Sequence, residues 1–252
     1  MPEGPSLVIL REETRHFVGK TIVLAEGNTR TVDLGNLAGK RITSLRSWGK
    51  HFMIEMKGAN LRIHFMLFGS YRIDERKDNV KPRMSLQFAD GSELNFYACS
   101  IQPIDDDVDA QCDWDADVMS PTWDSAKARK KLRARPDLLV CDALLDQTIF
   151  AGVGNIIKNE VLFRVRLHPL STIGALSAPK LRQLVEQARQ YCFEFLEWKK
   201  AYVLRQHWLA HKKRPFARAA TSYFPRATSA SPAAIPFSAS AARSGTPEQE
   251  SK

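Results

Sequence analysis

Cysteine is scarce in this sequence, and its spacing excludes two common uses. The 252-residue chain has four cysteines, with no Cys-x-x-Cys pair and no short Cys/His spacing among them: Cys99, Cys112, Cys141 and Cys192. Zinc sites and disulfide-stapled small domains need cysteines at close or regular intervals. We therefore expect reduced thiols and no metal cofactor.

Long hydrophobic runs are also missing. No apolar stretch approaches the roughly 18 residues that cross a bilayer, and the N-terminus lacks the basic and apolar segments of a secretion signal. With 44% hydrophobic residues, the chain can still bury one large core or two modest ones. We expect a globular protein of the cytoplasm, with two domains.

Acidic charge is in deficit, and the net charge of +9 suits a polyanionic partner such as nucleic acid. The excess is uneven along the chain. Seven Lys/Arg against two Glu give residues 212–252 a charge of +5, which leaves +4 for the rest. Generic nucleic-acid binding through this basic end is thus one candidate function.

Hydrophobic periodicity divides the remaining sequence into a strand-rich half and a helical half. Residues 6–18 predict one short amphipathic helix behind an extended N-terminus. Alternation with a period of two then predicts strands, several of them separated by turn residues. These strands are expected at 21–25, 41–47, 51–56, 61–66, 70–73, 84–88 and 94–98. The pattern is that of a β-sandwich.

Seven aspartates between Asp105 and Asp117 predict an exposed linker. Helices are expected after it, at 123–133, 143–150, 156–165 and 178–198. Residues 216–252 are rich in Ala, Ser and Pro and show no sustained period, which predicts a disordered tail. The fold class is α+β: an N-terminal β-sandwich preceded by a short helix (1–117), a helical domain (118–213) and the tail (214–252).

The first chemical motif is the N-terminal Met-Pro-Glu-Gly-Pro. Removal of Met1 would expose the amine of Pro2, whose pKa near 8 leaves much of it unprotonated at neutral pH. Such an amine can attack the anomeric carbon of a nucleoside and form an iminium, and Glu3 beside it can transfer protons. The segment can equally be only a stiff, polar start of the chain.

Two further motifs supply possible phosphate contacts. Lys50 follows a glycine in a predicted hairpin turn, where a lysine can reach a phosphate or remain a solvated surface residue. Residues 144–155 end in Gly152-Val153-Gly154-Asn155 just before a predicted helix. Asn155 is a good N-cap, and the free backbone N–H groups behind it would form an anion site. An ordinary helix pair would explain the glycines and the cap, but not the whole string 144–155 at this spacing from the N-terminal Pro-Glu.

In their order and distances, the three motifs resemble the formamidopyrimidine-DNA glycosylase and endonuclease VIII family, from Pro2 to about Lys213. The resemblance implies base excision repair of damaged double-stranded DNA by a monomer, located at the nucleoid when bound. It also implies DNA glycosylase and abasic-site lyase activity with β,δ-elimination. Residues 152–155 would belong to a helix-two-turns-helix element.

The resemblance also implies residue roles. Pro2 is the nucleophile, Glu3 the proton donor and acceptor, and Lys50 a phosphate contact that assists catalysis. Gly154 and Asn155 grip a phosphate beside the lesion. The loop from His64 to Phe68 carries the wedge that fills the place of the extruded base, with Leu67 as the filler and Phe68 beside it. A strand end packed in the core is the alternative for these two residues.

The sequence departs from the family pattern in two places. Gly4 stands where the formamidopyrimidine branch begins with Leu, and residues 98–101 replace an Arg-rich wedge. Both departures lean towards endonuclease VIII and oxidised pyrimidines. The family's four-cysteine zinc finger has no cysteines here, and Arg218 or Arg226 would have to replace its arginine. The alternative function is therefore a catalytically impaired protein that binds lesions or abasic sites.

Overall fold

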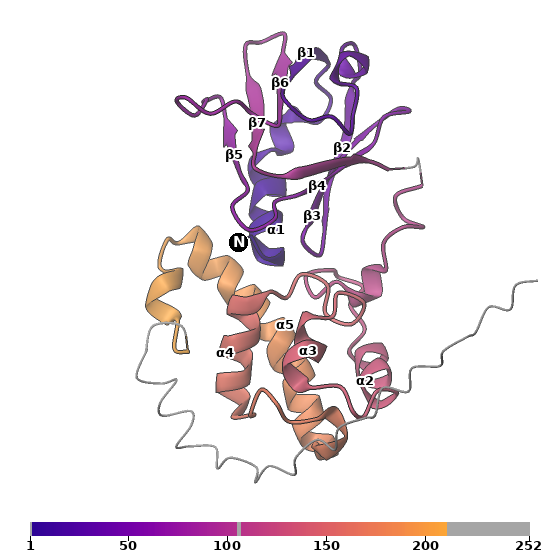
Figure 1. Ribbon diagram of the computed structural model, residues 1–252, viewed down its shortest axis with the longest axis vertical. Coiled ribbons are helices and arrows are strands. Elements are labelled where there is room, and N and C mark those ends of the chain that lie inside the picture. Colours follow the sequence, from indigo (N-terminus) through magenta and orange to yellow (C-terminus); the bar gives the residue numbers. More distant parts are fainter. Residues whose placement is uncertain (1, 105–106, 211–252) are drawn as a thin grey trace, which may run out of the picture. The chain divides into compact units, whose positions relative to one another are not determined.

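The strand-rich half consists of two antiparallel sheets. The computed structural model describes residues 2–104 and 107–210, and all bounds below refer to them. The sheets are built from β1 (Ile22–Glu26), β2 (Ile42–Trp48), β3 (His51–Met56), β4 (Leu61–His64), β5 (Ser70–Ile73), β6 (Met84–Phe88), β7 (Glu93–Tyr97) and β8 (Ser100–Pro103). Their orders are β1-β6-β7-β5 and β2-β3-β4-β8, which confirms the predicted sandwich (Figure 1).

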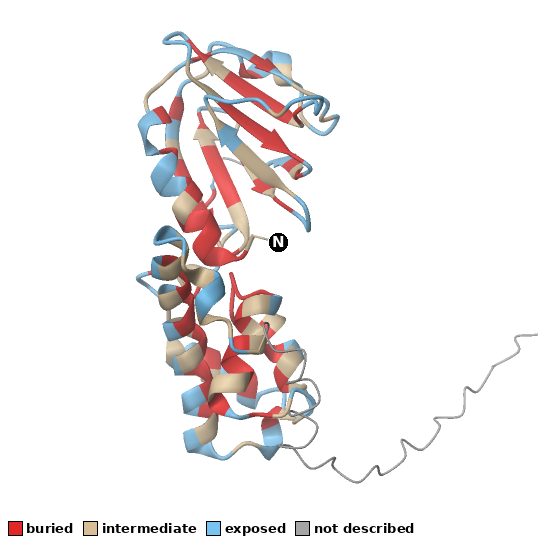
Figure 2. Ribbon diagram, turned by 90° about the vertical axis from the view of Figure 1, so that its left-hand side faces the viewer, coloured by how far each residue is buried: buried red, intermediate tan, exposed pale blue. Residues whose placement is uncertain are grey.

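Alternating burial along the strands explains why the two sheets pack together. In β4, for example, Leu61 and Ile63 are buried and the residues between and after them are half-exposed. The buried faces meet in one apolar cluster that also receives Leu7 and Leu10 from the first helix. Figure 2 shows these buried positions in red along the strands. Burial of such large side chains contributes roughly 1.5–3 kcal/mol each.

The first helix, α1 (Gly4–Glu13), begins earlier than its apolar period indicates. Residues 4–6 are helical and buried, so the predicted extended N-terminus is wrong beyond Glu3. Pro5 stands in the first turn, where its missing N–H costs nothing and its fixed φ favours the helix. A short helical turn, η1 (Arg15–Phe17), follows the helix.

The helical half has its own core. It contains α2 (Ser125–Arg133), α3 (Val140–Leu145), α4 (Asn155–Val165) and α5 (Ala178–Lys200), with the short turns η3 (Trp114–Ala116), η4 (Ile173–Ala175) and η5 (Leu204–His207). The turn η2 (Leu34–Leu37) belongs to the strands. The predicted helix at 143–150 is misplaced, because α3 ends at Leu145 and the residues after it form turns. The helical cluster is centred on α4 and α5.

The segment between the halves is more buried than its aspartates predict. Val108, Ala116 and Asp117 are 3%, 3% and 4% exposed, so the expected exposed loop is wrong at these positions. Helix α1 then connects the halves, since it packs against β2 and β3 on one side and against α5 on another. The described residues belong to one compact unit. The predicted tail and both candidate arginines, Arg218 and Arg226, lie outside them.

Candidate active site

Glu3 is the most constrained of the predicted site residues. It is 1% exposed, and its carboxylate accepts hydrogen bonds from the backbone N–H groups of Gly154, Ile156 and Ile157 at 3.2, 2.8 and 3.1 Å. These donors form the start of α4, where the helix dipole favours negative charge. Burial raises the pKa of Glu3, while the three N–H groups and the charge of Lys50 oppose that rise.

This arrangement corrects the predicted anion site. The N-cap of α4 is Gly154, not Asn155, and three backbone donors at the helix start bind the chain's own Glu3. Asn155 is the first helical residue; its side chain is exposed and accepts from Lys158 Nζ at 3.1 Å. A phosphate contact by the exposed Asn155 side chain stays a prediction. The backbone N–H groups at the start of α4 cannot supply that contact, because Glu3 already occupies them.

Lys50 lies in the two-residue turn between β2 and β3. Gly49 before it has φ +55°, a conformation that glycine adopts without strain. The N–H of Gly49 donates to a carboxylate oxygen of Asp117 at 3.0 Å. Lys50 is half-buried, and this burial lowers the pKa of its amine, against the attraction of Glu3. The amine of Lys50 and the carboxylate of Glu3 are thus electrostatic neighbours.

Close backbone contacts between glycines bring the three motifs together. The N–H of Gly4 donates to the carbonyl of Gly152 at 2.8 Å, and a Cβ on Gly4 would lie 2.9 Å from the Gly152 Cα. A Cβ on Gly49 would lie 3.2 Å from the Ala151 Cβ. Only glycine at positions 4 and 152 allows this approach. Pro2 and Glu3, Lys50 and the turn before α4 therefore meet at one place.

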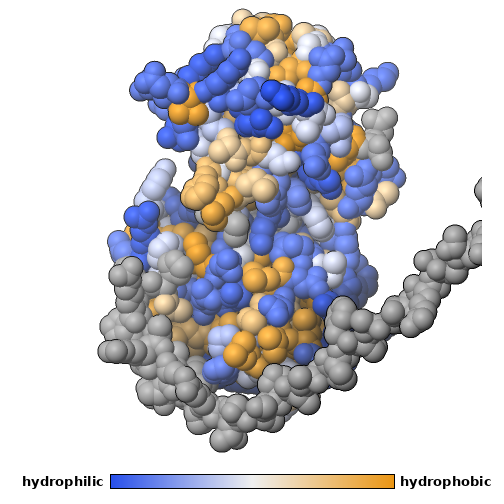
Figure 3. All heavy atoms as spheres, viewed as in Figure 1, coloured by the Kyte–Doolittle hydropathy of each residue, from blue (hydrophilic) through white to orange (hydrophobic). Residues whose placement is uncertain are grey.

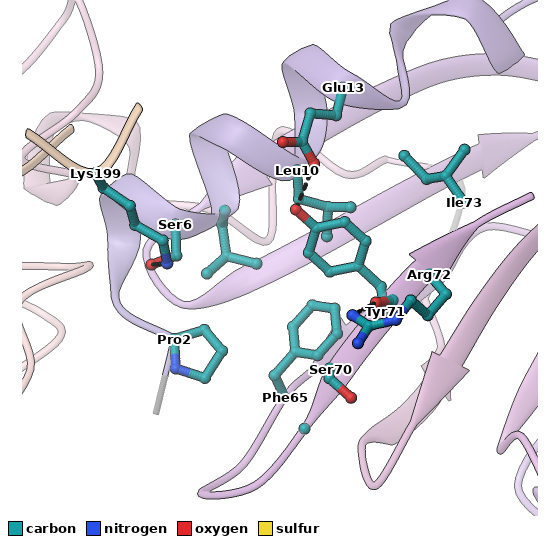
Figure 4. A pocket seen from close by; sticks show the side chains of 12 residues that line it. Pro2, Ser6, Leu10, Glu13, Phe65, Ser70, Tyr71, Arg72, Ile73 and Lys199 are labelled. Carbon is teal, nitrogen blue, oxygen red and sulfur yellow. Dashed lines mark hydrogen bonds between the residues drawn. The ribbon is translucent and has the colours of Figure 1, made fainter. Parts of the chain in front are cut away.

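Pro2 lines a cavity of about 430 Å³ on the strand side of this meeting point. Its wall comes from α1, from the segment between β4 and β5, from β5 itself and from the end of α5. Figure 4 shows Pro2, Ser6 and Lys199 on one side and the Tyr71–Glu13 pair on the other. The remaining lining residues are Leu7, Leu10, Phe65, Gly69, Ser70, Arg72 and Ile73. The cavity is large enough for a nucleobase.

The loop after β4 projects three apolar side chains. Met66, Leu67 and Phe68 are 52%, 58% and 81% exposed, which excludes the alternative of a strand end packed in the core. Figure 3 shows hydrophobic residues in orange grouped among hydrophilic ones on one face of the molecule. The loop is closed by the N–H of Gly69, which donates to the Phe65 carbonyl at 2.7 Å. An exposed apolar loop beside a cavity is suited to inserting into another molecule.

Two histidines lie beside Lys50. The rings of His51 and His64 are 5.0 Å apart, and His64 Nδ1 accepts from the N–H of Met66 at 3.2 Å. Burial, then the charges of His64, Arg62 and Lys50, lowers the pKa of His51 to about 4. The pKa of His64 is also lowered, by burial, Lys50 and Arg62. Both rings are therefore neutral at neutral pH and can form hydrogen bonds without adding charge.

Sequence reasoning missed three residues that shape the site. Asp117 is buried and ties the β2–β3 turn to the helical half through the N–H groups of Gly49 and Met119. Ser6 and Lys199, from α1 and α5, form a hydrogen bond at the wall of the cavity. No local pattern marks any of them, because their partners lie 68 and 193 residues away.

The residues present do not fit a four-cysteine zinc site. Cys99 and Cys192 are buried in separate cores, burial raises their pKa values, and the sequence after Cys192 has no cysteine. Among the described residues, no three His, Cys, Asp or Glu side chains form a group that could hold a metal ion. Those residues also include no helix that is long and apolar enough to span a membrane.

Comparison with known proteins identifies two matching family models. The model for the formamidopyrimidine-DNA glycosylase N-terminal domain matches residues 1–99, and the model for the H2TH domain of the same glycosylase matches residues 116–204. The chain is 30% identical to the DNA-(apurinic or apyrimidinic site) lyase Nei2 of Mycolicibacterium smegmatis, over 75% of this chain and 76% of that protein.

Other matches are more distant or more partial. Human Endonuclease 8-like 2 is 35% identical over 56% of this chain, and the match spans 45% of the human protein. Among solved structures, Lactococcus lactis formamidopyrimidine-DNA glycosylase bound to DNA with an abasic site superposes with a TM-score of 0.72. That match covers 82% of this chain and 86% of the other at 22% identity, which establishes a common fold.

Proposed function

Because the chain belongs to the formamidopyrimidine-DNA glycosylase family, we propose that it excises damaged bases from double-stranded DNA through a covalent Pro2 intermediate. It then cleaves the strand at the resulting abasic site by β,δ-elimination. The observation that carries this proposal is the convergence of Pro2, Glu3 and Lys50 beside a cavity of nucleobase size. The relative Nei2 bears the name of an abasic-site lyase.

The reaction starts with the amine that is exposed when Met1 is removed. The Pro2 nitrogen attacks C1′ of the damaged nucleotide, the N-glycosidic bond breaks, and its electron pair leaves with the base, which is protonated. The C1′–O4′ bond then opens to give the iminium. Glu3 supplies the proton that O4′ takes up, and its raised pKa favours the carboxyl form that this step requires.

The iminium makes elimination possible. It acidifies C2′, and removal of a proton there breaks the C3′–O3′ bond and releases a phosphate. A second elimination breaks the C5′–O5′ bond, and water hydrolyses the remaining adduct to free Pro2. Lys50, in the turn before β3, and His64, at the end of the neighbouring strand β4, are electrostatic neighbours and are proposed to contact phosphates beside this sugar. Asn155, exposed at the start of α4, is proposed as a further phosphate contact.

Extrusion of the base needs a filler for the gap that it leaves. Leu67 and Phe68 are proposed to enter the base stack, since unstacking a base costs a few kcal/mol that an inserted apolar side chain offsets. The extruded base would enter the cavity beside Pro2. Oxidised pyrimidines are the proposed lesions, because the chain carries Gly4 and residues 98–101 in place of the features of the formamidopyrimidine branch, and its relatives include enzymes named endonuclease 8.

We also propose that residues 1–117 and 118–213 act as separate catalytic and DNA-binding domains of a monomer, located with the DNA in the cytoplasm. The absence of cysteines after Cys192 favours one alternative function. In it, the protein binds lesions or abasic sites and does not process them, because the zinc finger that would hold the DNA is missing.

Borohydride trapping on abasic-site duplex DNA tests the proposal. The chain with Met1 removed should form a covalent DNA adduct that maps by mass spectrometry to the N-terminal peptide. Low salt is needed because phosphate contacts dominate affinity. A chain with one extra residue before Pro2, whose nitrogen is then an amide and cannot attack, should lose the adduct at Pro2, whereas Pro121→Gly should keep it. DNA binding without an adduct in the unaltered chain would establish the alternative and overturn the proposal.

A further inference from the structure

A lysine from the helical half reaches into the cavity of the strand half. Lys199, in the last turn of α5, lines the cavity together with Pro2, and its Nζ donates to the hydroxyl oxygen of Ser6 at 2.6 Å. Ser6 belongs to α1 and is 7% exposed. The next residue, Lys200, is exposed and forms a salt bridge with Glu12 at 2.7 Å instead. One of two adjacent lysines is therefore turned inward, to the cavity.

The lining of the cavity includes an apolar part. Leu7, Leu10 and Phe65 are nearly fully buried and belong to that lining. Tyr71 offers little to a ligand, because its hydroxyl donates to the Glu13 carboxylate at 2.6 Å. A base in this cavity would meet these apolar groups, with the Lys199 amine at one edge and Ser70 and Arg72 among the other lining residues. A charged donor beside apolar walls helps to fix both the orientation and the choice of ligand.

The Lys199 amine has N–H donors available for a ligand. An ammonium group has three N–H donors, and among the described residues its recorded acceptor is the Ser6 hydroxyl. Burial lowers the pKa of Lys199, while Glu13 and Glu3 oppose this. Partial burial also makes a bond from this amine stronger than one made in water. The group that it suits is a hydrogen-bond acceptor at the edge of a ring.

We propose that Lys199 is a specificity-determining residue that donates a hydrogen bond to a ring carbonyl oxygen of the extruded base. Oxidised pyrimidines such as thymine glycol carry one such carbonyl next to the glycosidic nitrogen, at C2, and one opposite it, at C4. Ser6 holds the amine in place before the base arrives, which lowers the entropy cost of the contact. This inference rests on the proposed function, since it requires a base in the cavity beside Pro2.

Because Lys199 is proposed to contact the base, its loss should slow base release and leave cleavage of a preformed abasic site unchanged. A preformed abasic site has no base to bind, and its cleavage needs only Pro2 and the phosphate contacts. The test compares Lys199→Met, Lys199→Arg and the matched control Lys200→Met in single-turnover assays. The substrates are a duplex with 5-hydroxyuracil, a duplex with thymine glycol and a duplex with an abasic site. Thermal unfolding checks that each variant is folded.

Lys199→Met should release both bases about 10- to 100-fold more slowly, the effect of one charged hydrogen bond. Its abasic-site cleavage should stay within about threefold of the unaltered chain. Lys199→Arg should recover part of base release, and Lys200→Met should leave both reactions unchanged. Base release by Lys199→Met at the original rate, or an equal loss of both reactions, would overturn the inference.

Failure of the proposed function would have another signature. If the unaltered chain cleaves no abasic-site DNA, the Pro2 chemistry itself is absent and the Lys199 inference falls with it. If the unaltered chain cleaves abasic sites but releases neither base, the Pro2 chemistry stands and the inference about Lys199 is contradicted. The abasic-site substrate thus separates the two failures.

Discussion

At the scale of single residues, the site is held by carboxylates that sequence motifs describe only in part. The motif around Pro2 predicts a reactive amine with an acid beside it, and both lie at the cavity and its border. What it does not predict is that Glu3 also caps α4, 151 residues further on. Local residue preference predicts Asn155 as the cap of α4. In the structure, the side chain of the distant Glu3 accepts from the first N–H groups of this helix instead.

His51 should make the protein sensitive to acid. Its pKa in the folded state is lowered to about 4 from an ordinary 6.5. Stability from the neutral ring is therefore present above pH 6.5 and is lost as the pH falls through 4, by on the order of 3 kcal/mol. His51→Phe should narrow the difference in unfolding free energy between about pH 7 and about pH 4.5. Denaturant titrations at the two pH values measure it.

The exposed His16 provides the control for this experiment. His16→Phe should leave the pH dependence of unfolding as it is in the unaltered chain, since the remaining carboxylates and His64 titrate in both. An acid response of His51→Phe equal to that of the unaltered chain would show that the ring is not held in a state that disfavours its charge.

At the scale of helices and strands, period and polarity predicted most of the sandwich and three of the later helices to within a few residues. The errors have physical causes. β8 was missed because its four residues alternate too briefly to register, and it exists through pairing with β4. α3 was misplaced because apolar residues at 149–151 belong to a buried turn and not to a helix. Lys199 could be placed on a helix but not at a cavity, which depends on how α5 packs against α1.

The contact between α1 and the turn before α4 should tolerate no side chain at Gly4. A Cβ there would lie 2.9 Å from the Cα of Gly152, a backbone atom that cannot rotate away. Alanine is the better helix former, by about 1 kcal/mol, but the clash outweighs this, and we expect Gly4→Ala to lower the unfolding free energy by about 1–3 kcal/mol. Since Pro2 and Glu3 precede Gly4 directly, borohydride trapping should slow as well.

Gly35→Ala is the matched control, because its new Cβ would meet only the side chain of Asp33, at 3.3 Å. It should change neither thermal unfolding nor trapping. Gly4→Ala could instead unfold and form the trapped adduct as the unaltered chain does. The backbones at Gly4 and Gly152 could then separate without loss of stability, and their contact would not position the N-terminus.

At the scale of the whole molecule, the two halves are tied by a reciprocal pair of buried carboxylates. Glu3 of the strand half accepts from the start of α4, and Asp117, next to the helical half, accepts from Gly49 in the β2–β3 turn. Burial raises the pKa of both groups. Each carboxylate thus fixes a different catalytic element, the N-terminus in one case and the turn that carries Lys50 in the other.

Replacement of Asp117 should therefore weaken both halves at once. In Asp117→Asn, an amide N–H₂ replaces one of the two oxygens that accept from Gly49 and Met119, which should cost about 1–3 kcal/mol. The remaining contacts, between Gly4 and Gly152 and between α1 and α5, still couple the halves. Hydrogen exchange measured by mass spectrometry should then show equal losses of protection in β3 and in α4.

Asp124→Asn tests whether such losses are specific to the connection between the halves. Asp124 caps α2 through the N–H groups of Ala126 and Lys127, and asparagine is an equally good cap. We expect no change in either half for this variant. A loss of protection in Asp117→Asn that is confined to β3 would mean that the halves unfold independently. The meeting of Pro2, Glu3 and Lys50 would then depend on bound DNA and not on the fold alone.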